Sequence, residues 1–492
     1  MIQEHLPVLQ VALPLVAAPL CLLLTRAMWA WLLALTVSLA ALGISIVLLR
    51  GVYTGEVISY AIGGWAAPWG IEYRVDAVNA FILIIVTAIS TVTLMFAKTS
   101  VAQEVAGDKQ GLFYTAWLLC LTGLLGIAIT GDVFNLFVFL EISSLSSYVL
   151  IGLGQDRRAL TASFQYLVMG TIGATFILIG IGLLYMVTGT LNMMDLAARL
   201  AVLGDSRTVQ TALAFLTVGI GLKLALFPLH LWLPNAYTYA PSAVTVFLAA
   251  TATKAAVYML LRFLFQVFDA SFTFGAMPLG GFLAVLAAAG ILSTSTVSIF
   301  QDNIKRMLAY SSVAQVGYMV LGISLVSSAG LTAAVLHLFN HALMKGALFL
   351  ALGCVAYRLG SVRLGAIAGL GQRMPWTMAA FLVGALSLIG IPLTAGFVSK
   401  WYLILAAVER GWWPLVVVVI AGSLLAIIYV WRVVEMAYLR PPPEKLSVTE
   451  APLSLLVPTW LLAGANVYFG IDTRFSVGMA RQAAALLTGS NG

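Results

Sequence analysis

Long apolar runs are the feature that most constrains how this chain can fold. A helix needs about 20 apolar residues to cross the hydrocarbon core of a bilayer, and the sequence holds fourteen runs near that length. They fall near residues 7–24, 28–49, 76–97, 111–130, 133–153, 160–187, 209–231, 240–266, 275–299, 307–327, 331–357, 376–403, 411–437 and 451–470. We therefore expect an all-α polytopic membrane protein with about fourteen transmembrane helices.

The composition supports the same class of protein. Of the 492 residues, 62% are hydrophobic and 9% are charged, whereas soluble domains carry about 25% charged residues. The net charge is +7, but the basic residues are scattered over short loops. We therefore expect a lipid bilayer around the chain and no nucleic-acid partner. The cysteines Cys21, Cys120 and Cys354 lie in apolar runs without ligand spacing, so we expect no metal site.

The loops between the runs differ in their content of lysine and arginine. If the N-terminus lies outside, thirteen of these residues fall in inner loops and eight, Arg262 among them, fall in outer segments. Short cytoplasmic loops of membrane proteins carry the excess of basic residues. We therefore expect both termini on the outer side of the membrane.

Five charged side chains interrupt the apolar runs. Glu141 stands alone among Phe, Leu, Val and Ile, and four lysines, Lys223, Lys254, Lys345 and Lys400, also lie within runs. A charge in mid-membrane costs at least about 2.5 kcal/mol on insertion scales, so charges kept there usually serve a function. Snorkelling of the amine to the interface is the alternative for Lys254 or Lys400, which lie nearer to uncertain helix ends.

The runs of Lys223 and Lys400 also contain residues that break helices. They read GLKLALFPLHLWLPNAYTYAP (221–241) and SLIGIPLTAGFVSKW (387–401). Proline removes a backbone donor and frees a carbonyl, and discontinuous helices mark ion paths in transporters. A simple packing kink is the alternative at either site. The predicted breaks are at Pro228, Pro234, Gly390 and Pro392.

The two interrupted runs are the seventh and the twelfth of the series. Because they are five spans apart, an odd number, two five-helix units would be inverted relative to each other. We expect helices four to eight and nine to thirteen to form these repeats. The corresponding division is an N-terminal three-helix segment (1–110), a first repeat (111–266), a second repeat (275–437), and a C-terminal helix and tail (438–492).

The stretch LHLFNHALMKGALF places His337, His341 and Lys345 at steps of four, on one helix face. Two histidines at this spacing could bind a metal, but no carboxylate or cysteine is near and the HExxH pattern is absent. A hydrogen-bonded polar face without further function is a second alternative. We favour a ladder of proton carriers bridged by water, because imidazole titrates near neutral pH.

The stretch TATKAAVYMLLRF places Lys254 on one helix face with Thr251 and Tyr258. From this position Lys254 could link Lys223 to the ladder that begins at His337. The hypothetical order across the membrane plane is Glu141, Lys223, Lys254, the His337–His341–Lys345 ladder and Lys400.

Taken together, several motifs resemble those of a known family. They are GDVFNLFVFLEISSLSSY, GLKLALFPLHLWLPNAYTYAP, TATK, HLFNHALMKG and GFVSKW. They resemble the antiporter-like subunits of Mrp-type multisubunit cation/proton antiporters, a family shared with the L, M and N subunits of respiratory complex I. The resemblance covers about residues 70–435 and is strongest to the D-type component of the Mrp antiporters. It implies a proton path through Glu141, Lys223, Lys254, His337, His341, Lys345 and Lys400.

The resemblance also implies the function and the partners. We expect a proton-translocating subunit of a sodium or potassium/proton antiporter in a bacterial plasma (inner) membrane, assembled with subunits of the Mrp A, B, C, E, F and G types. The alternative is a proton-pumping subunit of a redox complex, complex I or a membrane-bound hydrogenase.

No haem, iron–sulfur or nucleotide motif is present. We therefore expect a transporter subunit rather than an enzyme, without a cofactor or catalytic residues. Since the resemblance places Lys223 on a helix next to that of Glu141, we expect these two residues to form an ion pair that gates proton movement.

Overall fold

In a computed structural model the chain is almost entirely helical, and the structure describes residues 3–204, 206–442 and 448–489. Within these ranges, twelve helices are long and apolar enough to cross a membrane. They are α1 (Leu6–Leu23), α2 (Ala27–Val52), α3 (Ala77–Glu104), α4 (Gln110–Ile129), α5 (Val133–Gly152), α6 (Arg157–Thr188), the pair α10 (Ser242–Ala250) and α11 (Ala252–Arg262), α12 (Leu279–Ile299), α13 (Ile304–Ser324), α14 (Ser328–Leu359), α18 (Trp413–Val434) and α19 (Leu453–Ile471). The predicted all-α polytopic class is confirmed.

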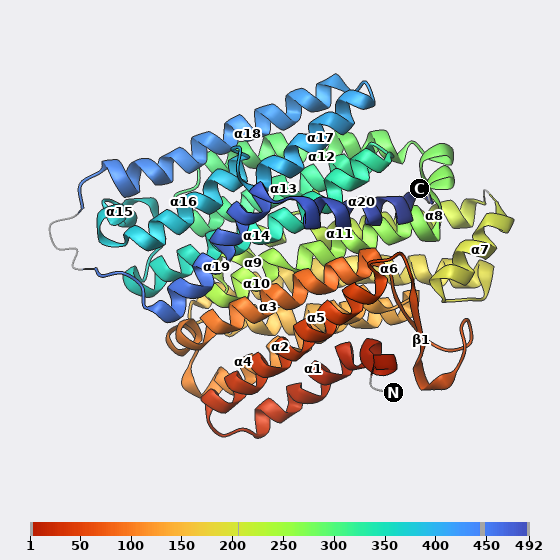
Figure 1. Ribbon diagram of the computed structural model, residues 1–492, viewed down its shortest axis with the longest axis horizontal. Coiled ribbons are helices and arrows are strands. Elements are labelled where there is room, and N and C mark those ends of the chain that lie inside the picture. The colour runs from red at the N-terminus through yellow and green to blue at the C-terminus, as the bar shows by residue number, and fades with distance from the viewer. Residues whose placement is uncertain (1–2, 205, 443–447, 490–492) are drawn as a thin grey trace.

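The two remaining expected spans are the discontinuous ones. The first consists of α8 (Arg207–Leu224) and α9 (Trp232–Tyr239), and the second of α16 (Pro375–Ile389) and α17 (Ala395–Glu409). They run in opposite directions along the bundle (Figure 1), as inverted repeats require.

Three of the four predicted breaking residues lie inside the two interruptions. Pro228 lies between α8 and α9, and Gly390 and Pro392 lie between α16 and α17. The prediction for Pro234 is wrong, because this residue lies in the first turn of α9. Backbone N–H groups of a first helical turn have no partner within the helix, so proline is tolerated there.

A third interruption separates α10 from α11, at a point where the chain has no proline or glycine. The backbone of Thr251 leaves the helical region, with φ −130° and ψ −54°. Its hydroxyl donates to the carbonyl of Phe247 at 2.6 Å. The span that carries Lys254 is therefore also built from two short helices.

Both ends of the chain lie at the same end of the bundle, which we call the terminal end (Figure 1). The antiparallel strands β1 (Ile58–Ala61) and β2 (Glu72–Val75), with Ile58 opposite Val75, lie there. So does α7 (Met193–Leu203). The expected C-terminal tail contains a further helix, α20 (Arg474–Thr488), which packs on α14 and α3.

Several helices begin at side chains that cap their free N–H groups. Asp76 accepts hydrogen bonds from the backbone of Val78 and Asn79, while the Asn79 side chain accepts from the backbone of Asp76, so that α3 starts with a reciprocal capping box. Asp132 caps α5 through the N–H of Asn135 at 2.7 Å. These caps set where two of the functional helices enter the bundle.

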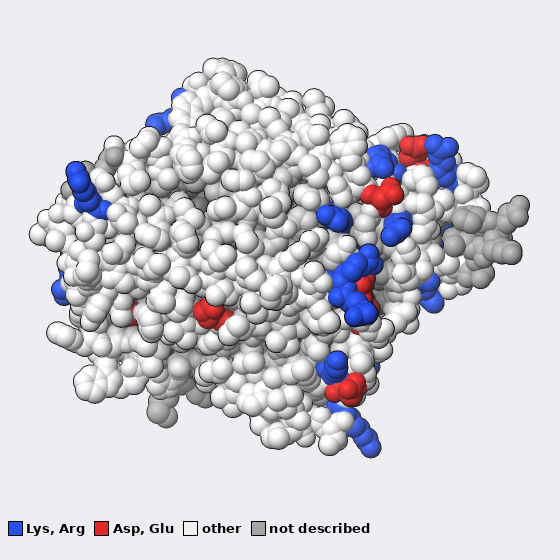
Figure 2. Space-filling view, turned by 180° about the vertical axis from the view of Figure 1, so that it is seen from behind, with Lys and Arg blue, Asp and Glu red and all other residues white. Residues whose placement is uncertain are grey.

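Helix α14 is the centre of the bundle, and residues 330–355 of it are buried. It packs against α3, α10, α13, α16, α17 and α19. The peripheral helices α2, α6 and α18 instead expose apolar side chains such as Leu39, Phe164 and Val417. Figure 2 shows a broad, mostly white band across the middle of the molecule, interrupted by a red acidic patch, with lysines and arginines gathered towards the end opposite the terminal end.

Candidate functional site

Glu141 on α5 and Lys223 on α8 form the expected ion pair. Their Oε1 and Nζ atoms are 3.4 Å apart, and Lys223 also donates to Ser144 Oγ at 2.9 Å. The Lys223 side chain is 3% exposed and that of Glu141 is 28% exposed. Ser144 lies one turn beyond Glu141, so one face of α5 supplies both acceptors. The break after Leu224 ends α8 directly beside Lys223.

A small cavity separates this pair from α11. Its volume is about 20 Å³, room for about one water molecule. Ser143, Ser144 and Lys223 line one side, and Ala252 and Ala255 of α11 line the other. Hydroxyl groups and an ammonium around a space of this size give a bound water several partners on the α5 and α8 side, and the alanines of α11 close the other side.

Lys254 lies in the first turn of α11 and is fully buried. Its ammonium group donates to the carbonyl of Ala249, on the far side of the Thr251 interruption, and lies 3.4 Å from Thr253 Oγ1. A carbonyl near the end of a short helix lacks a helical N–H partner, so the break itself supplies an acceptor for the lysine.

The three residues of the predicted ladder share one face of α14 and are buried. The rings of His337 and His341 are nearly parallel, with centroids 6.2 Å apart. His337 contacts Ser399 Oγ through Nδ1 at 2.8 Å and Gln315 Oε1 through Nε2 at 3.0 Å. Neither ring nitrogen of His341 has a hydrogen-bond partner among the described residues.

Lys345 continues this face. Its Nζ donates to the carbonyl of Leu308 at 2.7 Å and to Ser311 Oγ, both on α13. No group of three His, Cys, Asp or Glu side chains able to hold a metal ion occurs in the part of the chain that the structure describes.

Lys400 on α17 lies beside the second break. Its Nζ donates to the carbonyls of Leu388 and Ile389, at 3.0 and 2.9 Å, and to Ser423 Oγ at 2.9 Å. The two carbonyls belong to the last turn of α16, where the break removes their helical donors. The ammonium also lies 4.9 Å above the ring of Tyr318.

The helices that carry these residues are neighbours in the expected order. Helix α8 packs against α11, α11 against α14, and α14 against α17. The packing of these helices therefore places the seven predicted residues in one row from the Glu141–Lys223 pair to Lys400, and all of them except the partly exposed Glu141 are buried.

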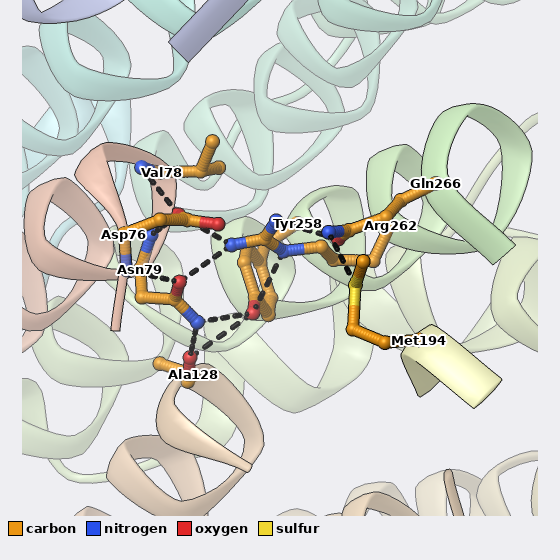
Figure 3. Close-up of polar contacts among 8 residues, drawn as sticks. All are labelled: Asp76, Val78, Asn79, Ala128, Met194, Tyr258, Arg262 and Gln266. Carbon is orange, nitrogen blue, oxygen red and sulfur yellow. Dashed lines mark hydrogen bonds and ion pairs between the residues drawn. The ribbon is translucent and has the colours of Figure 1, made fainter. Parts of the chain in front are cut away.

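Two buried basic residues were not predicted from the sequence, because both lie near the ends of apolar runs and were assigned to loops. Arg262, at the end of α11, is 3% exposed and pairs with Asp76 at 2.6 Å (Figure 3). Lys305, at the start of α13, is 6% exposed and donates to the carbonyl of Ala240 at 2.9 Å. A signal for Arg262 was present, since it continues the Lys254–Tyr258 face by one more step of four.

Lys305 and Glu104 line a cavity of about 390 Å³ at the end of the bundle opposite the terminal end. The Glu104 carboxylate accepts from Ser100 Oγ at 2.8 Å and from the first N–H of α10, that of Ser242. The cavity brings solvent-sized space to the beginning of the span that carries Lys254.

Comparison with known proteins identifies relatives of the whole chain. The chain is 43% identical over 487 residues to NADH-quinone oxidoreductase subunit N of Desulforudis audaxviator, covering 95% of this chain and 96% of that protein. It is 31% identical over 397 residues to the D-type component of the Na(+)/H(+) antiporter of Alkalihalophilus pseudofirmus, covering 80% and 79%. Among solved structures, a chain of the Mrp complex from Dietzia sp. DQ12-45-1b matches with a TM-score of 0.91 and 26% identity, covering 100% of this chain and 98% of that one.

The relatives are subunits of two kinds of membrane complex, as their names state. Residues 130–426, which include every residue of this row, match the family described as NADH:quinone oxidoreductase/Mrp antiporter, TM. The resemblance expected from the motifs is thereby confirmed, and the chain belongs to the NADH:quinone oxidoreductase/Mrp antiporter transmembrane family.

Proposed function

We propose that this chain translocates protons as a subunit of a multisubunit monovalent cation/proton antiporter. The observation that carries the proposal is the 3.4 Å pair between Glu141 and Lys223 inside the membrane-spanning bundle. A buried ion pair contributes little net stability, because desolvation offsets the attraction between the charges. A pair that can be made and broken is therefore better explained by transport than by structure.

The path begins at this pair. While Glu141 is charged and close, it holds Lys223 protonated. When Glu141 moves away or is neutralised, the lysine is left buried without a counter-charge, and its proton passes through the cavity beside Ser144 to Lys254.

From Lys254 the proton passes to the α14 ladder of His337, His341 and Lys345 and then to Lys400. The parallel rings of the two histidines and the packing of α14 against α17 support this order. An imidazole has two ring nitrogens, so it can accept a proton on one and donate from the other without leaving its place in the helix.

Orientation follows from the basic residues. The excess of lysine and arginine in alternate loops supports a terminal end on the outer side of a bacterial plasma membrane. The cavity with Glu104 and Lys305 then opens to the inside, at the start of the span that carries Lys254.

The partly exposed carboxylate of Glu141 supports a multisubunit setting. An ionised side chain facing lipid is expensive, yet 28% of the Glu141 side chain is uncovered in this single chain. A neighbouring subunit covering α5 would remove that contact with lipid. We therefore assign to the partners, subunits of the Mrp A, B, C, E, F and G types, the task of enclosing Glu141.

A second candidate is a proton-pumping subunit of a redox complex. It is favoured by the 43% identity to a protein named NADH-quinone oxidoreductase subunit N. Affinity purification of the tagged chain from its own membranes, followed by mass spectrometry, separates the two. Small antiporter subunits support the first candidate, and hydrogenase or NADH-oxidising subunits support the second.

Substitution of the pair tests the transport function. Glu141→Gln should nearly abolish cation/proton exchange by the assembled complex in membrane vesicles, while Glu141→Asp keeps part of it. The double variant Glu141→Gln with Lys223→Met should be no worse than either single variant, because residues of one pathway are not additive. Near-normal exchange by an assembled Glu141→Gln complex would refute the proposal.

A further inference from the structure

A second buried ion pair, Asp76–Arg262, lies near the terminal end within a cluster of hydrogen-bonded side chains (Figure 3). Asp76 caps α3, and Arg262 is the last residue of α11. Arg262 Nη2 lies 2.6 Å from Asp76 Oδ1 and 2.6 Å from Asn79 Oδ1. Asp76 is 4% exposed, Arg262 is 3% exposed and Asn79 is 2% exposed, so both charges are shielded from water.

The other two nitrogens of the guanidinium group also donate hydrogen bonds. Nε donates to the Tyr258 hydroxyl at 3.1 Å, and Nη1 donates to Gln266 Oε1 at 2.7 Å. The group also lies over the ring of Tyr258, 5.2 Å from its centroid. Bonds on three sides of the planar guanidinium hold Arg262 in this position while its pair with Asp76 is formed.

The cluster joins three helices. The Tyr258 hydroxyl donates to the carbonyl of Ala128 at the end of α4, at 3.0 Å, and accepts from Asn79 of α3 at 2.8 Å. Gln266, one turn further along the chain than Arg262, contacts Met194 Sδ of α7 at 3.5 Å. The cluster therefore fills the space between α3, α4 and α11 just below the surface helix α7.

Lys254 lies on the same face of α11 as Tyr258 and Arg262. Lys254, Tyr258 and Arg262 follow each other at steps of four, which places them on one face of α11 about 6 Å apart along its axis. Helix α11 runs from Lys254 towards the terminal end, and Gln266 beyond it is only partly buried. A proton that left Lys254 along this face would meet Tyr258, then the Arg262–Asp76 pair, and then the surface.

We propose that Asp76, Arg262 and Tyr258 form a gate that keeps closed a side exit from Lys254 to the terminal end, apart from the route to Lys400. The inference rests on the proposed function, in that Lys254 carries protons. With the pair formed, the cluster occupies the way out between α3, α4 and α11. The gate opens when the guanidinium leaves Asp76, and it is closed in this structure.

A gate of this kind makes a specific prediction about leakage. Asp76→Asn combined with Arg262→Gln removes both charges and leaves no unpaired buried charge. In proteoliposomes of the purified complex without transported cation, this variant should let an imposed pH gradient decay about tenfold faster than wild type, equivalent to about 1.4 kcal/mol in the barrier. Adding Lys254→Met should abolish the extra leak, because the leak uses the same path.

Glu72→Gln is the matched control. Glu72 is a carboxylate at the same end, 6% exposed, held by Asn192 Nδ2 at 2.9 Å and Ser59 Oγ at 2.6 Å, and outside the cluster. It should leak no more than wild type. If the double variant fails to assemble, Arg262→Lys is measured instead. It keeps the charge but cannot reach Tyr258, Gln266 and Asp76 together, so a smaller leak with the same dependence on Lys254 is expected.

Each other result overturns the gate. A leak that survives Lys254→Met would be a packing defect. Normal exchange without a leak would make the cluster a structural clamp, and lost exchange without a leak would make it a relay. A wild-type complex that moved no protons would instead overturn the proposed function, and this is seen before any variant is compared.

Discussion

Lys400 allows the charge of a proton carrier to be separated from its hydrogen bonds. Lys400→Met leaves the carbonyls of Leu388 and Ile389 without the donor at about 3 Å that they have now. Orphaning a buried acceptor costs about 1–3 kcal/mol, hence about 2–6 kcal/mol for two. Removing a charge from the membrane returns about 2.5–3.5 kcal/mol. The net destabilisation is therefore at most about 3–4 kcal/mol, small enough for the complex to assemble.

Lys400→Gln replaces the ammonium with a neutral amide that still has two N–H donors. We expect its thermal stability, measured on the purified complex in detergent, to lie between those of Lys400→Met and wild type. Cation/proton exchange in vesicles should fall at least about tenfold in both variants. Lys109→Gln, on the exposed turn η3 (Gly107–Lys109), is the control and should change neither quantity.

Two results would refute this reasoning. Exchange near the wild-type rate in Lys400→Gln would show that the charge is not needed for transport. Equal loss of thermal stability in the Met and Gln variants would show that the two carbonyls do not depend on the ammonium.

Two further predictions concern α14 and the second break. His337→Ala and His341→Ala should each slow exchange while assembly stays intact, and stoichiometric bound metal lost in both variants would contradict a proton ladder. Gly396→Ala should lower the thermal midpoint of the complex, because its Cβ would lie 1.8 Å from the carbonyl oxygen of Ser387, and overpacking typically costs about 1–3 kcal/mol. Gly281→Ala, with no heavy atom within 4 Å of the new Cβ, is the control and should not lower it.

The parts of the fold and site that could be predicted from sequence are those set by local chemistry. The length of the apolar runs predicted a helical membrane protein, because backbone groups in lipid must form their hydrogen bonds within a helix. Pro228, Gly390 and Pro392 revealed two breaks through their own backbone geometry, and steps of four placed the ladder on one face of α14. The ion pair between Glu141 and Lys223 followed from the rarity of charge in mid-membrane together with the family resemblance.

The parts that were missed depend on tertiary packing. The break at Thr251 has no proline or glycine, and the Thr251 hydroxyl and the Lys254 ammonium satisfy carbonyls of the preceding turn only in the folded bundle. Arg262 and Lys305 lie near the ends of apolar runs, where sequence alone cannot distinguish a loop residue from a buried one. Their partners, Asp76 and Ala240, lie at the ends of α3 and α9, far away in the chain.

The partners of the buried lysines suggest where transport is controlled. Lys254, Lys345 and Lys400 donate to carbonyls and hydroxyls, and among the described residues only Lys223 of the four has a carboxylate within ion-pair distance. A lysine held by neutral groups can release its proton without leaving an unpaired negative charge, whereas release from Lys223 leaves the carboxylate of Glu141 without its partner. Proton transfer along Lys254, Lys345 and Lys400 can therefore be easy in both directions. Movement of Glu141, the one partly exposed member of the row, then decides when a proton can leave Lys223, so a neighbouring subunit that covers α5 is in a position to set the direction of transport.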